Sequence, residues 1–197
     1  MKFKFIISDL DGVIRHYPPE RNLKIEKKYG LSEGVLLELA FQKDKLLPAI
    51  CGSMSDEEWR DSIELSLGQL VGPETARLAM QEWNNFSGMI DHEYLDYMNV
   101  RFANIPVVIL TNGTTRLSQD LKKLGIENHF FRIFNSADIG YCKPDQKIFK
   151  HVLQELGCQG HEVLFIDDSL SHVDSAKALG MITHHYQSLN LLKLNFE

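Results

Sequence analysis

Four aspartates occur in two pairs that are far apart in the sequence. Asp9 and Asp11 follow an apolar run near the start of the chain, and Asp167 and Asp168 follow another near its end. Carboxylates that lie close together raise each other's pKa, so a pocket that holds all four needs a cation. Ligand sets made only of oxygen suit Mg²⁺. The two pairs therefore predict a magnesium site, with Mg²⁺ as the cofactor.

Several of these residues, and others predicted to lie near them, have side chains that can react with or bind a phosphate group. An Asp can attack phosphorus and form an aspartyl-phosphate, and Asp9 is the candidate. Asp11, two residues on, is placed to protonate the leaving oxygen and then to deprotonate the hydrolytic water. Thr111 and the backbone amide of Asn112 can hydrogen-bond phosphate oxygens, and Lys143 can neutralise their charge. Together these residues predict the hydrolysis of a phosphomonoester.

Short apolar runs between helical patterns predict the fold class. Continuous apolar strands suit a parallel sheet covered on both faces, and the order strand, polar turn, helix repeats along the chain. Strands are predicted at residues 3–8, 106–110, 131–135, 163–166 and 182–185, and helices at 118–124, 145–156 and 173–179. We therefore expect an α/β fold with a doubly wound, Rossmann-like parallel sheet.

These predicted strands should bring the reactive residues together. Ligands of open α/β sheets bind at the carboxyl ends of the strands. The first aspartate pair ends the first strand, Thr111 and Asn112 end the second, and the second aspartate pair ends the fourth. Lys143 lies in a loop just before a helix. One pocket at this edge of the sheet is the expected result.

The stretch from about residue 18 to 102 breaks the alternation, with helical patterns and no convincing strand. Ser55 is a good N-cap, and Glu58 three residues later completes a capping box. Pro73 suits the first turn of a further helix. An all-helical insert after the first strand would lie over the site as a cap. We expect a core at residues 1–15 and 100–197 and a cap at 16–99 that opens for substrate and closes against water.

The order of the polar segments resembles that of the haloacid dehalogenase superfamily. A single pair of aspartates is common by chance, but the ordered set is specific and covers nearly the whole chain. The helical insert resembles the C1-type cap of this superfamily, as in its small sugar-phosphate phosphatases and the phosphatase domain of soluble epoxide hydrolase. The matching segments are Asp9-Leu10-Asp11-Gly12-Val13, Leu110-Thr111-Asn112-Gly113, Lys143-Pro144-Asp145 and Asp167-Asp168-Ser169.

The resemblance implies a role for each matching residue. Asp9 would be the nucleophile and a metal ligand, and Asp11 would be the acid and base, with its backbone carbonyl on the metal. Asp168 would bind the metal directly, and Asp167 would act through water or as a neighbour. The implied activity is a Mg²⁺-dependent phosphatase for a small phosphorylated metabolite, with a sugar phosphate as the first candidate. The phosphate would be bound by Thr111, Asn112 and Lys143.

Other activities share such a scaffold. A dehalogenase would lack the second aspartate of the first pair, and Asp11 is present. A phosphomutase similar to β-phosphoglucomutase keeps both aspartates and a helical cap, so it stays an alternative. A phosphonate hydrolase would bring a cap lysine into the site, but the lysines here fit a charged helix face. A non-catalytic binding protein, the alternative from another class, would be expected to lose Asp9 or Asp11.

Composition limits the partners. The net charge is −6 and no basic stripe is visible, so nucleic acid is not an expected partner. No stretch approaches about 18 apolar residues, so no membrane span is expected. The three cysteines are widely spaced and fit reduced thiols in the cytoplasm. The chain is expected to be a monomer or a homodimer.

Several other residues are expected to have ordinary structural roles. The histidines His172, His184 and His185 are predicted to lie on the surface or in packing. Arg15 and His16 lie where the chain leaves for the insert, which suggests a hinge, with a substrate contact by His16 as the alternative. The side chains of Trp59, Trp83, Phe86 and Met89 could line the pocket. Aromatic residues on amphipathic helices usually form a core, however, so a place in the core of the cap is the expectation.

Overall fold

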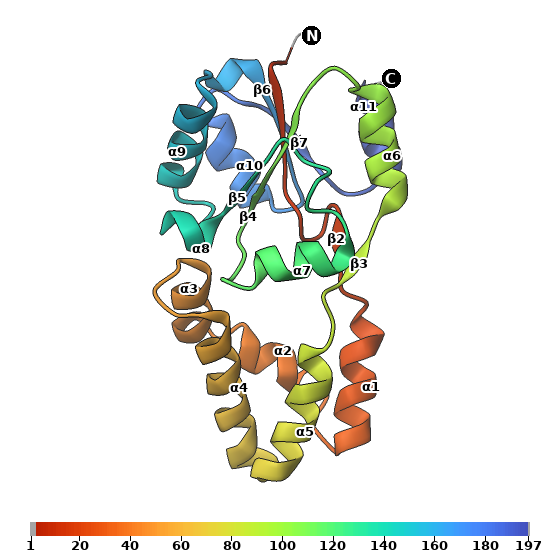
Figure 1. Cartoon of the computed structure of the whole chain (residues 1–197), viewed down its shortest axis with the longest axis vertical. Helices are drawn as coiled ribbons and strands as arrows, with labels where there is room; N and C mark the ends of the chain where they lie inside the picture. Colours follow the sequence, from red (N-terminus) through yellow and green to blue (C-terminus); the bar gives the residue numbers. More distant parts are fainter. Residues whose placement is uncertain (1–2, 197) are drawn as a thin grey trace.

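A five-stranded parallel sheet forms the centre of the larger layer of the molecule. The computed structural model describes residues 3–196. The strands run in the order β5-β4-β1-β6-β7, all parallel to their neighbours (Figure 1). The α/β fold class predicted from the sequence is therefore confirmed. The strands are β1 (Phe5–Ser8), β4 (Val107–Thr111), β5 (Arg132–Asn135), β6 (Val163–Asp167) and β7 (Ile182–His185).

Both faces of this sheet are buried, which explains why its strands are apolar without alternation. Successive residues of β1 point to opposite faces: Ile6 packs in one core cluster and Ile7 in the other. One cluster includes residues of α6 (His92–Arg101), α7 (Leu117–Leu124) and α11 (Leu189–Phe196). The other includes residues of α9 (Gln146–Leu156) and α10 (Leu170–Lys177). Helices on both faces make the sheet doubly wound.

Five helices form a second layer with a hydrophobic cluster of its own, placed below the sheet layer in Figure 1. The capping box at the start of the longest of them is present: Ser55 Oγ accepts from the Glu58 amide at 3.1 Å, and the Glu58 carboxylate accepts from the Ser55 amide at 2.8 Å. Both chain termini lie at the opposite end of the molecule (Figure 1). The helices are α1 (Pro19–Tyr29), α2 (Val35–Ala40), α3 (Lys43–Ile50), α4 (Asp56–Val71) and α5 (Pro73–Asn84).

Two very short strands join the layers. β2 (Arg15–His16) pairs antiparallel with β3 (Met89–Ile90), so the chain leaves for the helical layer and returns from it at the same place. The sequence analysis found no strand in this stretch, because two residues give no readable pattern. α6 then packs in a core cluster of the sheet through Tyr94 and Met98, although the sequence boundary had assigned most of it to the cap. We propose that the cap is the segment between β2 and β3.

The ends of the core helices follow sequence signals. Gly125 and Gly157 end α7 and α9 in the left-handed conformation, with φ of 69° and 61°, which glycine adopts without strain. The helix predicted at residues 173–179 begins earlier, at Leu170, and ends at Lys177. Two short helical segments, α8 (Ser136–Ile139) and a 3₁₀ turn (Gly160–Glu162), complete the core. Within residues 3–196, no helix combines the length and the hydropathy needed to cross a membrane.

Candidate active site

Three predicted site residues meet in the buried centre of the molecule. Asp9 follows β1, Asp167 ends β6, and the two strands are neighbours in the sheet. Nζ of Lys143 lies 2.9 Å from Asp9 Oδ2 and 2.6 Å from Asp167 Oδ2. The exposed fractions are only 6% for Asp9, 2% for Lys143 and 0% for Asp167. A single lysine therefore bridges two carboxylates that the sheet has removed from water.

Burial and charge act against each other on these groups. Burial raises the pKa of Asp9 to about 7, against the opposing effect of Lys143. Burial acts to lower the pKa of Lys143, but the charges of Asp9 and Asp167 raise it overall. For Asp167, burial acts to raise the pKa, and the hydrogen bonds and charges of His172 and Lys143 lower it overall. Perturbed ionisation of clustered groups in a pocket is typical of a functional site.

The backbone fixes the orientation of Asp9. Its Oδ1 accepts a hydrogen bond of 2.7 Å from the Leu10 amide, and its own amide donates to the carbonyl of Ile166 at 2.8 Å. The carboxylate is thus held at the carboxyl end of β1 by the turn that follows the strand. A nucleophile needs such fixed placement, because misplacement by about 1 Å can cost a hundredfold in rate.

Asp11, half-buried, is paired with a residue that the sequence analysis interpreted only as part of a hinge. Arg15 donates from Nε to Asp11 Oδ1 at 2.6 Å and from Nη2 to Asp11 Oδ2 at 2.9 Å. The Arg15 side chain is nearly buried and passes beside Gly88, where a Cβ atom would lie 2.6 Å from Arg15 Cγ. The spacing of four residues between Asp11 and Arg15 was the sequence signal that could have indicated this ion pair. It was missed because β2 was not recognised.

The side chain of Asn112 is hydrogen-bonded to the backbone of Lys143 and so fixes the loop that carries this lysine. Its Oδ1 accepts from the Lys143 amide at 2.8 Å, and its Nδ2 donates to the Lys143 carbonyl at 2.9 Å. Thr111, which ends β4, is buried with an exposed fraction of 1%. The side chain of Asn112 is therefore engaged, and only its backbone amide remains for the phosphate contact expected from the sequence.

Asp168 lies on the open side of the cluster. Its carboxylate packs against Gly12, where a Cβ atom would lie 2.0 Å from Asp168 Oδ2, so only glycine fits there. Gly12 also has φ of 83°, which favours glycine. Burial and the charge of Asp167 raise the pKa of Asp168.

Two histidines lie closer to the site than the sequence analysis expected. His172 Nδ1 lies 3.0 Å from Asp167 Oδ1, although it was assigned to the helix surface. His185 pairs with Asp167 in the register of β6 and β7, and its Nε2 lies 3.0 Å from the Asp168 carbonyl. Parallel strand pairing brings β7 beside β6, which sequence separation does not reveal.

The carboxylates of this cluster suit a divalent cation that prefers oxygen, and one imidazole nitrogen lies beside them. Asp9, Asp167 and His172 each offer a ligand atom, and these atoms lie within 4.8 Å of one another. The four motif aspartates face two cations, Lys143 and Arg15. The cluster therefore keeps an excess of negative charge, which would repel a phosphate dianion. A divalent cation bound by carboxylate oxygens would remove this repulsion.

A cavity of about 430 Å³ lies between the cap and the sheet layer and reaches the reactive groups. From the sheet layer it is lined by Asp11, Asn112, Gly113 and Thr114, and from the cap by residues of α1 to α5. A volume of this order suits a small molecule. Trp59, Trp83 and Phe86 line this cavity, and Trp59 also belongs to the cap core. The exposed Met89 is not among the lining residues.

Comparison with known proteins identifies the class. Residues 93–180 match the family of haloacid dehalogenase-like hydrolases. A solved haloacid dehalogenase family enzyme from Bacteroides thetaiotaomicron, in complex with magnesium and inorganic phosphate, superposes with a TM-score of 0.76 at 27% identity and covers 96% of this chain and 98% of its own. The chain is therefore similar to the haloacid dehalogenase-like hydrolases in this segment and in its fold, as its motifs indicated.

Curated relatives indicate which kind of hydrolase the chain resembles. D-ribitol-5-phosphate phosphatase of B. thetaiotaomicron is 26% identical, covering 91% of this chain and 90% of the relative. A sesquiterpene phosphatase of Aspergillus oryzae is 34% identical, covering 41% of this chain and 42% of the relative. Bifunctional epoxide hydrolase 2 of Sus scrofa is 26% identical, covering 93% of this chain and 36% of that longer enzyme. With these phosphatase-named relatives, the chain is a hydrolase of the phosphatase type.

Proposed function

We propose that this protein is a Mg²⁺-dependent phosphatase that hydrolyses the phosphomonoester of a small metabolite through an aspartyl-phosphate on Asp9. The observation that carries the proposal is the placement of Asp9. Its carboxylate is buried, oriented by the Leu10 amide, and bridged by Lys143 to Asp167. The cavity that starts at Asp11 gives a phosphorylated molecule space beside it.

In the proposed reaction, Asp9 attacks phosphorus and the bond from phosphorus to the alcohol oxygen breaks. Asp11 protonates that oxygen, so the alcohol leaves neutral. In the second half, Asp11 takes a proton from water, and the water oxygen attacks the phosphorus of the aspartyl-phosphate. Phosphate then leaves and the Asp9 carboxylate is restored. The Asp11–Arg15 pair orients the Asp11 carboxylate from the cap side of the site.

Three residues of the chain would stabilise the negative charge on the phosphate oxygens. Lys143 carries the permanent positive charge, and Thr111 and the backbone amide of Asn112 supply hydrogen bonds. The loop that carries Lys143 is fixed by the two bonds from the Asn112 side chain. We infer that replacement of any of these three residues weakens phosphate binding more than it changes the fold.

Mg²⁺ would be held by Asp9, by the backbone carbonyl of Asp11 and by Asp168. Bound there, it would neutralise the clustered carboxylates and polarise the phosphate. Asp167 would position Lys143 and would not bind the metal directly. Both of its oxygens already accept hydrogen bonds, from Lys143, Ser169 and His172. This division follows the one implied by the sequence. It is supported by the contacts of Asp167 and by the position of Asp168 on the open side.

The substrate class follows from the relatives. The two phosphatases named above act, by their names, on the phosphate of a sugar alcohol and on that of a sesquiterpene. Both are phosphomonoesters of small alcohols, which supports a small phosphorylated metabolite here. The first candidate from the sequence is a sugar phosphate, and the relative that matches over most of both chains is named for the phosphate of a sugar alcohol.

The test is phosphate release from a panel of phosphorylated metabolites by the purified protein, with Mg²⁺ and with EDTA. The proposal expects metal-dependent release from one or a few compounds. The phosphomutase alternative predicts an isomeric phosphate ester in place of free phosphate, which phosphorus NMR of the same reactions distinguishes. A folded protein that binds these compounds and converts none of them would instead be the non-catalytic binding protein.

A further inference from the structure

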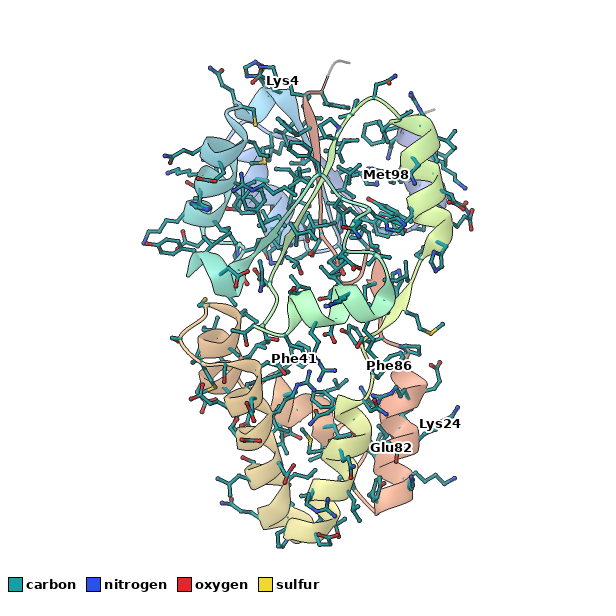
Figure 2. The ribbon with its side chains drawn as sticks, viewed as in Figure 1. Lys4, Lys24, Phe41, Glu82, Phe86 and Met98 are labelled. Atoms are coloured by element: carbon teal, nitrogen blue, oxygen red, sulfur yellow. The ribbon has the colours of Figure 1, made fainter. Side chains whose placement is uncertain are left out.

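The cavity between cap and sheet layer has two different kinds of wall. Where it meets the reactive groups it is polar, with Asp11, Asn112 and Thr114. On the cap side it is largely apolar. Figure 2 shows Phe41 and Phe86 at the boundary between the two layers. The apolar wall includes Leu37, Phe41, Leu46, Trp59, Trp83 and Phe86.

Part of this apolar wall is exposed to solvent. The exposed fraction is 65% for Phe41 and 41% for Leu37, and both residues line the cavity. Large apolar side chains that stay exposed beside a site are stabilised when a ligand removes them from water. The wall therefore favours an apolar group in the cavity.

The polar side chains of the cavity are largely occupied by one another. Arg60 donates from Nε to Asp56 at 2.5 Å and from Nη1 to Asn84 at 2.5 Å. Thr114 donates to the other oxygen of Asp56 at 2.6 Å. Arg21 donates to two backbone carbonyls at the end of α5. A molecule covered with hydroxyl groups would find few free partners here, and buried hydroxyl groups without partners are costly.

One polar atom is different. Nη1 of the buried Arg15 has no hydrogen-bond acceptor among the described residues, and its nearest carboxylate, Asp120, lies 3.7 Å away. This atom belongs to the residue that holds Asp11, so it lies at the inner end of the cavity, next to the reactive groups. It can donate a hydrogen bond to one oxygen of a ligand close to the ester.

We propose that the cavity takes the leaving group of the substrate, and that this leaving group is an alcohol with an apolar carbon body rather than a polyol. The proposal rests on the phosphatase function proposed above. Phosphate would lie at Asp9 and Lys143, the ester oxygen at Asp11, and the apolar body against the wall of Phe41 and Leu37. The substrate class is a phosphate monoester of an alkyl, aryl or isoprenoid alcohol.

The test compares kcat/KM for a series of primary alkyl phosphates, from ethyl to octyl, and for ribitol 5-phosphate, all with Mg²⁺. The expected result is a rise of about two- to fourfold for each added methylene until the cavity is filled. A flat or falling series, with ribitol 5-phosphate as the better substrate, would overturn the apolar leaving group and leave the phosphatase intact. No phosphate release from any compound would overturn both.

Two matched phenylalanine variants test whether the preference for long alkyl chains depends on the cavity wall. Phe41 on the cavity wall and Phe131 on the sheet layer have the same exposed fraction, 65%. Phe41→Ser is expected to lower kcat/KM for octyl phosphate about tenfold and to change that for ethyl phosphate less than twofold. Phe131→Ser should leave both values unchanged. Circular dichroism confirms folding of each variant, and equal values for the two variants on octyl phosphate would contradict the proposal.

Discussion

Arg15 holds both carboxylate oxygens of Asp11, through Nε at 2.6 Å and Nη2 at 2.9 Å. The two residues belong to different parts of the molecule: Asp11 to the turn after β1, and Arg15 to β2, where the chain leaves for the cap. A bidentate contact fixes direction as well as distance. The strand that leads to the cap thus sets the orientation of the residue proposed as acid and base.

Replacement of Arg15 by lysine should therefore slow the reaction more than it weakens the fold. Lysine keeps the charge but cannot bind two oxygens in a fixed plane. We expect Arg15→Lys to lower kcat by about tenfold to a hundredfold in steady-state phosphate release, because Asp11 loses its orientation. Arg77→Lys, at an exposed pair with Glu74, is the matched control and should keep full activity. An Arg15→Lys enzyme with normal kcat would show that the contact does not position Asp11.

A side chain at position 88 should lower kcat, because it would displace Arg15. A Cβ atom at Gly88 would lie 2.6 Å from Arg15 Cγ, so Gly88→Ala should displace the arginine and reduce kcat. Gly125→Ala is the control: its φ of 69° is also strained for alanine, but no atom lies within 4 Å of the new methyl group. Both variants should lose about 1 kcal/mol or more of unfolding free energy in urea titrations. Only Gly88→Ala should lose activity, and equal kcat for the two would contradict the link.

The role of Asp11 predicts a dependence on the leaving group. Asp11→Asn cannot donate the proton, so its kcat/KM should fall most for alkyl phosphates, whose alkoxides leave poorly. An activated aryl phosphate leaves without protonation and should lose much less in the first step. The measurement is phenolate or alcohol release under single-turnover conditions. The same loss for both classes of ester would argue against the acid role.

Cys51 and Cys142 provide a probe of cap closure. Their sulfur atoms lie 3.0 Å apart, with Cys51 at the end of α3 in the cap and Cys142 next to Lys143. Burial raises the pKa of Cys142 to about 12, so the Cys142 thiol stays protonated near neutral pH. Diamide should take two electrons and two protons from the pair and leave a disulfide, detected by peptide mass spectrometry.

This disulfide should tie the cap to the core and lower phosphate release at least about tenfold, with recovery on reduction, because a closed cap hinders exchange of ligand. Cys51→Ser should resist diamide, whereas Cys158→Ser should respond like the wild type. Full activity of the cross-linked protein would mean that the cap need not open here.

The sequence predicted the sheet, and it predicted that several polar residues would lie close together at one edge of it. Uninterrupted apolar runs predicted the five parallel strands, and the structure brings the strand-end residues Asp9 and Asp167 into contact with the loop residue Lys143. Local rules sufficed there, because each strand is buried on both faces. They also predicted the capping box at Ser55.

The parts that were missed depend on long-range pairing. β2 and β3 have two residues each and exist only because they pair with one another. His185 reaches Asp168 because β7 pairs with β6, and Arg15 reaches Asp11 because the short β2 strand turns it back toward the site. The pairing of Cys51 with Cys142 depends on how the cap docks, which no local pattern encodes.

The central claim is that Asp9 carries the phosphoryl group, and mass spectrometry of the trapped protein tests it most directly. Asp11→Asn protein with Mg²⁺ and an activated aryl phosphate should form the intermediate and hydrolyse it slowly, because water lacks its base. After an acid quench, the phosphoryl group is expected on Asp9, and it should be absent from the Asp9→Asn, Asp11→Asn double variant. A phosphoryl group on His172 or any other residue, or an equal amount in the double variant, would contradict the mechanism.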